Sequence, residues 1–170
     1  MLVKLEREYN AERIVVSFDL NENTNQDESA LDEDAEDEQQ YAEDDHEIMG
    51  KIVSYPYFTV EITKQPGKTL KFHCEFNSEL GEEFSDHEGN EEIINIINVS
   101  VLDSSDKDKT VYCAETENLD SNLYMMLLNM LAERGIDKSF CQWLLDYSTA
   151  LEQQHYVKFL EELQGFVKLQ

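Results

Sequence analysis

The fold is indicated most directly by residues 57–76, YFTVEITKQPGKTLKFHCEF. Apolar and polar residues alternate in both arms of this segment, and the intervening Gln65-Pro66-Gly67 is typical of a turn. A period of two places every second side chain on the same face of a strand. The apolar positions are Phe58, Val60, Ile62, Leu70, Phe72, Cys74 and Phe76. The segment therefore predicts a β-hairpin with one covered face.

Strand patterns continue on both sides of this hairpin. Residues 2–20 predict an earlier hairpin that turns at Asn10-Ala11, because every second residue from Ile14 to Leu20 is apolar. Residues 93–102 form the most apolar predicted strand, and residues 111–116 form the last one. Hairpins joined in this way predict an antiparallel sheet with one face packed on a core.

The hydrophobic period changes to that of a helix after Glu117. One apolar stripe is predicted to pack on the core, and its helix ends at Gly135, a residue type common at helix C-termini. The stripe contains Leu119, Leu123, Met126, Leu127, Met130 and Leu131. Asp137 is the predicted N-cap of a second helix. The apolar residues of that helix are Phe140, Trp143, Leu144 and Tyr147.

A third C-terminal segment is predicted after Ser148-Thr149, which we expect to bend or break the second helix. Its broad apolar face is the predicted surface for core packing or oligomer contacts. The face contains Leu151, Tyr156, Phe159, Leu160, Leu163, Phe166 and Val167. Strands first and helices last predict an α+β fold with two or three C-terminal helices. A length of 170 residues suits a single domain over residues 1–170.

The charge of the chain is its most unusual property. Asp and Glu number 38 against 13 Lys and Arg, which gives a formal net charge of −25. Such a charge repels nucleic-acid phosphates and anionic membranes, so we expect no direct nucleic-acid binding. Basic proteins and cations are attracted instead. The alternative is that the charge serves only to keep the protein soluble.

Two segments hold most of the acidic residues. Residues 21–50 contain 13 Asp and Glu and no Lys or Arg, and residues 79–92 contain seven carboxylates. The first is predicted to be a disordered acidic loop, because it has too few apolar residues to offset the entropy of ordering. The candidate partner-binding residues are Asp32, Glu33, Asp34, Glu36, Asp37, Glu38, Glu43, Asp44, Asp45, Glu82, Glu83, Asp86 and Glu88.

No catalytic, nucleotide-binding or high-affinity metal motif is found in the sequence, so we predict no enzyme activity and no cofactor. The His-containing runs 44–47 and 86–88 are interpreted as solvated charge, and His73 and His155 as structural or surface residues. The cysteines Cys74, Cys113 and Cys141 are interpreted as buried free thiols of a reducing compartment. No apolar run is long enough to span a membrane, and no signal peptide or Arg-rich presequence opens the chain. We expect any targeting segment to have been removed or to lie outside this sequence.

Several segments resemble the mitochondrial glycoprotein family, which includes acidic matrix proteins that bind complement globular heads and hyaluronan. The N-terminal matches are the hairpin from Glu12 to Asn21, the acidic loop and Tyr57-Phe58-Thr59-Val60-Glu61-Ile62. The C-terminal matches are residues 119–124, LDSNLY; 131–137, LAERGID; 148–152, STALE; 159–163, FLEEL; and 166–168, FVK. The resemblance covers nearly the whole chain.

The resemblance implies a highly twisted seven-stranded antiparallel sheet flanked by helices, with three subunits closing a ring that has one strongly negative face. It also implies non-catalytic binding and chaperone-like work in the mitochondrial matrix, support of mitochondrial ribosomes and translation, and contacts with basic or RNA-binding proteins. Family members have an amphipathic helix before the first strand, whereas this sequence begins almost on that strand. We therefore expect either a truncated form or altered trimer packing.

Three other functions are weighed against this one. A histone-chaperone-like nuclear protein would also combine acidic tracts with a β core, but the C-terminal helices argue against it. A cell-surface receptor for complement remains an alternative, with a secondary surface or nuclear pool. An enzyme would need a constellation of reactive residues that the sequence does not supply.

Overall fold

A computed structural model describes residues 1–23, 53–77, 93–103 and 111–168. The strands form one six-stranded antiparallel sheet in chain order. They are β1 (Leu2–Tyr9), β2 (Glu12–Asn23), β3 (Pro56–Lys64), β4 (Lys68–Phe76), β5 (Ile94–Leu102) and β6 (Cys113–Glu115). The 3-10 turn η3 (Thr116–Asn118) then leads to α1 (Ser121–Glu133) and α2 (Lys138–Val167). The α+β order is confirmed.

Both predicted hairpin turns are confirmed. Asn10 and Ala11 have positive φ values of 46° and 63°, which suit a two-residue turn between β1 and β2. Gly67, at φ 119°, closes the turn between β3 and β4, and its N–H donates to Lys64 O at 2.7 Å. These turns fix the register in which the apolar residues of neighbouring strands share one face.

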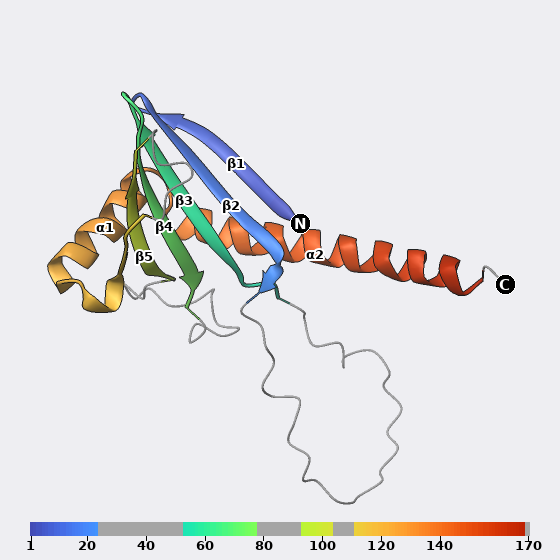
Figure 1. Ribbon diagram of the computed structural model, residues 1–170. Helices are drawn as coiled ribbons and strands as arrows, with labels where there is room; N and C mark the ends of the chain where they lie inside the picture. Colours follow the sequence, from blue (N-terminus) through green and yellow to red (C-terminus); the bar gives the residue numbers. More distant parts are fainter. Residues whose placement is uncertain (24–52, 78–92, 104–110, 169–170) are drawn as a thin grey trace, which may run out of the picture.

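The core lies between one face of the sheet and the two helices. Alternate residues of β2, β3, β4 and β5 are buried, as the period of two predicts. The largest buried core side chains are Phe18, Phe58, Phe72, Ile14, Ile96, Leu131 and Leu144. Figure 1 shows α2 crossing behind the sheet and projecting well beyond the strands. Only its N-terminal half therefore contributes buried residues, namely Cys141, Leu144, Leu145 and Ser148.

The helix ends form as their residues predict. Asp120 Oδ1 accepts from the N–H groups of Asn122 and Leu123, and Asp137 Oδ1 accepts from Phe140 N–H at 3.0 Å. Gly135 has φ +80° and lies just past α1. Its N–H donates to Ala132 O and that of Ile136 to Leu131 O, which is a Schellman motif.

The expected break at Ser148-Thr149 is wrong. The helix α2 runs without interruption for 30 residues. Ser148 is buried, and its hydroxyl donates to Leu145 O at 3.0 Å and lies 3.1 Å from Ser54 O. Its polar group is satisfied within the helix and against the segment before β3, so it does not compete with the helical hydrogen bonds.

Other details also differ from the predictions. The seventh strand implied by the family resemblance is not among the strands of the described residues, which number six. The loop predicted to begin at residue 21 is preceded by a longer strand, because β2 continues to Asn23; residues 24–50 lie outside the described ranges. In α1, Leu123 and Met126 are exposed, whereas Tyr124, Leu127 and Leu128 pack on the core. Met130 and Leu131 of the predicted stripe also face the core, so the stripe is confirmed in part.

A buried charge network joins the first hairpin to the end of α1. Glu12 is only 7% exposed, and its carboxylate accepts hydrogen bonds from Arg134 Nε at 2.6 Å and from Arg134 Nη2 at 3.1 Å. Lys64 Nζ lies 2.9 Å from the same carboxylate, and Arg134 Nη1 donates to Met130 O. These bonds to the carboxylate, the one from Arg134 above all, lower the pKa of Glu12 from 4.5 to about 2. The Glu12 carboxylate therefore links the start of β2, the end of β3 and the end of α1.

Replacing Gly135 with Ala is expected to lower the free energy of unfolding by ~1–2 kcal/mol, because Gly135 adopts the left-handed conformation. The added Cβ would also meet the guanidinium of Arg7. The matched control is Gly165→Ala, since no atom beyond the adjacent helix backbone lies within 4 Å of a Cβ there and alanine favours a helix interior. Urea denaturation checks both variants. Equal effects would contradict the assigned role of Gly135.

Candidate functional site

The two acidic segments of the sequence attach at the same end of the sheet. Residues 24–52 connect the end of β2 to the start of β3, and residues 78–92 connect the end of β4 to the start of β5. In an antiparallel sheet whose strands follow chain order, these four strand termini lie at the same end of the sheet (Figure 1). Both acidic segments therefore leave the sheet at the same end.

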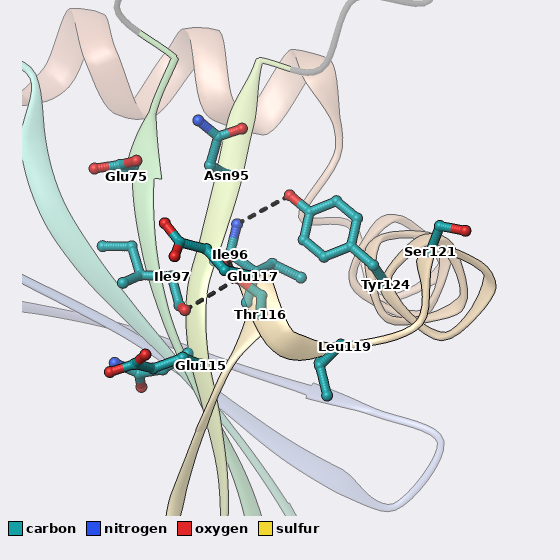
Figure 2. Close-up of a pocket in the computed structure, with 11 residues that line it drawn as sticks. Glu75, Asn95, Ile96, Ile97, Glu115, Thr116, Glu117, Leu119, Ser121 and Tyr124 are labelled. Carbon is teal, nitrogen blue, oxygen red and sulfur yellow. Dashed lines mark hydrogen bonds between the residues drawn. The ribbon is translucent and has the colours of Figure 1, made fainter.

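A cavity of about 660 Å³ lies at this end, between β5, η3 and α1. Figure 2 shows Glu75 on β4, Asn95 on β5, and Glu115 and Glu117 on either side of Thr116. The remaining lining residues are Ile96, Ile97, Asn98, Leu119, Ser121 and Tyr124. Three carboxylates thus surround a space whose described lining contains no Lys or Arg.

An irregularity in β5 shapes the cavity. His73 pairs with Asn98 and Cys74 with Ile96, so Ile97 is an extra residue that forms a β-bulge. Beside the bulge, the N–H of Ile96 donates to the Tyr124 hydroxyl at 3.3 Å. The Thr116 hydroxyl donates to the carbonyls of Ile96 and Ile97 (Figure 2). Side chains from η3 and α1 therefore satisfy the backbone of β5 where β6 does not reach it.

A second cavity of about 400 Å³ adjoins the first, since Ile97 and Asn98 line both. Besides Asn98, its polar lining residues are Ser17, Asp19, Glu22, Tyr57, Thr59 and His73. The strand register places Ser17, Thr59, His73, Asn98 and Glu115 in one row across β2 to β6. His73 and Glu75 alternate with the buried Phe72, Cys74 and Phe76. The row therefore lies on the face of the sheet that points away from the core.

His73 has an ordinary structural environment. Its Nδ1 lies 3.2 Å from Thr59 Oγ1. Partial burial, together with nearby Lys71, lowers the pKa of His73 despite the opposing charge of Glu61. This environment favours the neutral form of the His73 imidazole.

The predicted acidic binding residues lie outside the described residues. The whole set, from Asp32 to Asp45 and from Glu82 to Glu88, falls in the undescribed ranges. The His-containing runs 44–47 and 86–88 fall there too. The structure instead brings together three carboxylates that the sequence did not single out, those of Glu75, Glu115 and Glu117. Strand alternation places Glu75 outward, but only the pairing register could bring it near Glu115.

The predicted C-terminal apolar face is found in two environments. Leu151 is partly buried and packs on the core. Beyond it α2 projects from the sheet with its apolar residues exposed, up to 76% for Phe166. The exposed members are Tyr156, Phe159, Leu160, Leu163, Phe166 and Val167. They lie on one side of the helix, since they recur at spacings of three and four.

Two of the three cysteines, Cys74 and Cys141, are buried free thiols. Burial raises the pKa of Cys141 to about 12 and raises that of Cys74 as well. Cys113 is exposed on the three-residue edge strand β6, so its predicted burial is wrong. Within the described ranges no group of three His, Cys, Asp or Glu side chains is placed to hold a metal ion. No described helix is long and apolar enough to cross a membrane.

Comparison with known proteins gives consistent matches. The family model for mitochondrial glycoprotein matches residues 1–167. Complement component 1 Q subcomponent-binding protein, mitochondrial, of Rattus norvegicus is 37% identical over 98% of the chain, and the Homo sapiens protein is 35% identical. Conserved regulator of innate immunity protein 3 of Caenorhabditis elegans is 27% identical over 97% of the chain.

The chain spans 58% of the length of the rat and human relatives. Among solved structures, a Leishmania major protein of unknown function, described as a sequence homologue of human p32, superposes with a TM-score of 0.66. The match covers 97% of this chain and 76% of the other at 17% identity. This likeness supports the same fold.

Proposed function

Because the chain belongs to the mitochondrial glycoprotein family, we propose that it is a non-catalytic, chaperone-like acidic protein that binds basic polypeptides. The observation that carries the proposal is the distribution of charge. Two strongly acidic segments attach at one end of the sheet, and the cavity of Figure 2 adds Glu75, Glu115 and Glu117 at that end. A strong concentration of negative charge of this kind attracts Lys- and Arg-rich partners and speeds their encounter with the protein.

We further propose that the protein works in the mitochondrial matrix and supports mitochondrial ribosomes and translation by holding their basic proteins. The mammalian relatives carry the word mitochondrial in their names, which favours this compartment. Those names also describe binding to a complement component, so a complement-binding role at the cell surface is the second candidate. Subcellular fractionation and import assays distinguish the two sites of action.

The proposed assembly is a homotrimer. The supporting observation is the exposed apolar side of α2, from Tyr156 to Val167, which the described part of a single chain does not cover. A contiguous apolar surface of this kind is typical of a protein–protein contact. Three copies in a ring would also bring three sets of acidic segments together and raise the local density of carboxylates.

Neutralising the run from Asp32 to Glu38 is expected to weaken binding of basic partners and to reduce its dependence on salt. Exposed ion pairs contribute only ~0.2–1 kcal/mol each, so affinity must come from many weak contacts. The variant replaces Asp32, Glu33, Asp34, Glu36, Asp37 and Glu38 by their amides. Stopped-flow measurement with a Lys-rich polypeptide should show the largest loss in the association rate, because long-range attraction sets that rate.

The matched control is Asp34→Asn alone, which should change binding little. Loss of binding in this single variant would indicate a specific pocket at Asp34 and contradict the role of summed charge.

A further inference from the structure

The two adjoining cavities on the outer face of the sheet form a single candidate site, which we name the outer trough. It comprises the residues lining the 660 Å³ and 400 Å³ cavities, joined at Ile97 and Asn98. Even without the smaller cavity, the larger one has a volume within the range of about 300–1,000 Å³ found for ligand sites. The trough is built on strands, η3 and α1, so its groups have fixed positions.

The charge of the trough is one-sided. Glu75, Glu115 and Glu117 line its larger part, and Asp19 and Glu22 its smaller part. No Lys or Arg in the described part lines either cavity or forms an ion pair with Glu75, Glu115 or Glu117. By contrast, the Glu12 carboxylate is bonded to both Arg134 and Lys64. Asp19 is paired with the N-terminal ammonium of Met1, whereas the larger part of the trough has acceptors and negative charge without matching cations from the described residues.

A second observation also indicates a missing donor. Asn98 Oδ1 is buried, and no hydrogen-bond donor in the described residues reaches it. Buried polar atoms are nearly always paired, so an unpaired acceptor calls for an explanation. Asn98 lines both cavities and stands in the row between His73 and Glu115. The acceptor without a donor thus belongs to the residue at the junction of the trough.

We propose that the outer trough binds arginine side chains of a basic polypeptide segment, with Glu75, Glu115 and Glu117 as the anionic groups and Asn98 as a neutral acceptor. A guanidinium has five N–H donors and no acceptor, so it complements a site lined by carboxylate and amide oxygens. Lysine provides a single point of charge and satisfies fewer of these acceptors. The proposal rests on the proposed function and assigns it a defined site with a preference for arginine.

The test compares two charge-matched triple variants of the full chain. Glu75→Gln, Glu115→Gln and Glu117→Gln remove three carboxylates from the trough; Glu8→Gln, Glu133→Gln and Glu161→Gln remove three exposed carboxylates that line neither cavity. Both sets change the net charge equally. Calorimetric titration uses blocked tetra-arginine and tetra-lysine peptides, and thermal melting confirms that each variant is folded.

The wild type should bind tetra-arginine more tightly than tetra-lysine, and the trough variant should lose at least about tenfold in tetra-arginine affinity. The control variant should lose much less, and amide resonances of Ile97 and Asn98 should shift with tetra-arginine. Equal losses in both variants, with equal affinities for the two peptides, would overturn the trough and leave the proposed function standing. Absence of binding of either peptide to the wild type at low salt would overturn both.

Discussion

Replacing Arg134 with Ala is expected to lower the free energy of unfolding by about 3–5 kcal/mol, because it leaves the buried Glu12 carboxylate without its main partner. Lys64 remains near Glu12, but its side chain is largely exposed and provides one contact. The change also detaches the first hairpin from the C-terminus of α1, where Arg134 Nη1 donates to Met130 O. Chemical denaturation with a fitted slope measures the loss.

The control for this variant is Arg13→Ala. Arg13 pairs with Glu6 at 2.5 Å, and both side chains are largely exposed. Water and salt screen such a pair, so its removal should change stability far less. A loss for Arg134→Ala no larger than that for Arg13→Ala would show that the buried network does not hold these parts together.

The pH dependence of folding stability gives an independent test of the network of Glu12, Lys64 and Arg134. The pKa of Glu12 is lowered from 4.5 to about 2, so its contribution is fully present above pH 4.5 and is lost as the pH falls through 2. This lowering of the Glu12 pKa corresponds to ~3 kcal/mol of folding stability at neutral pH. The stability gap between wild type and Arg134→Ala should therefore narrow as the pH falls from 5 toward 2. A constant gap would contradict this assignment.

Replacing both Leu160 and Leu163 with Glu is expected to dissociate the proposed homotrimer into monomers. Both side chains are exposed on the projecting part of α2, so the substitutions should not unfold the single chain. Burial of one such leucine contributes ~1.5–3 kcal/mol, so losing two should weaken association by more than about a hundredfold. Sedimentation equilibrium at micromolar concentration measures the change in mass.

The control carries the same added charge on the opposite side of the helix, as Gln154→Glu with Gly165→Glu. It should keep the mass of the wild type. A wild type that is monomeric at micromolar concentration would contradict the proposed trimer, and equal dissociation by both variants would indicate a charge effect instead of an apolar contact.

Local patterns predicted most of the fold because each depends on residues close in sequence. The alternation from Phe58 to Phe76 predicted two strands, and Asp137 and Gly135 predicted helix ends that the structure confirms. Ser148 misled the prediction, because its buried hydroxyl is paired both with Leu145 O in the same helix and with Ser54 O, 94 residues away in sequence. Such long-range partners leave no local signal.

The candidate site was predictable only in its general charge. Runs of Asp and Glu are evident in composition, whereas the grouping of Glu75 with Glu115 and Glu117 depends on strand register and on the bulge at Ile97. Likewise, Glu12 and Arg134 are 122 positions apart, and only the folded chain pairs them. Sequence patterns define which face a side chain occupies, but not which distant side chains share it.

Salt dependence of binding tests the central claim most directly, namely that negative charge on this protein holds basic polypeptides. The measurement is the affinity of the unmodified protein for poly-lysine of defined length, across NaCl concentrations that shorten the Debye length from about 30 Å to about 3 Å. The account predicts tight binding at the lowest salt and a steady, large loss of affinity as salt rises. Affinity that stays constant over this range, or no binding at the lowest salt, would contradict it.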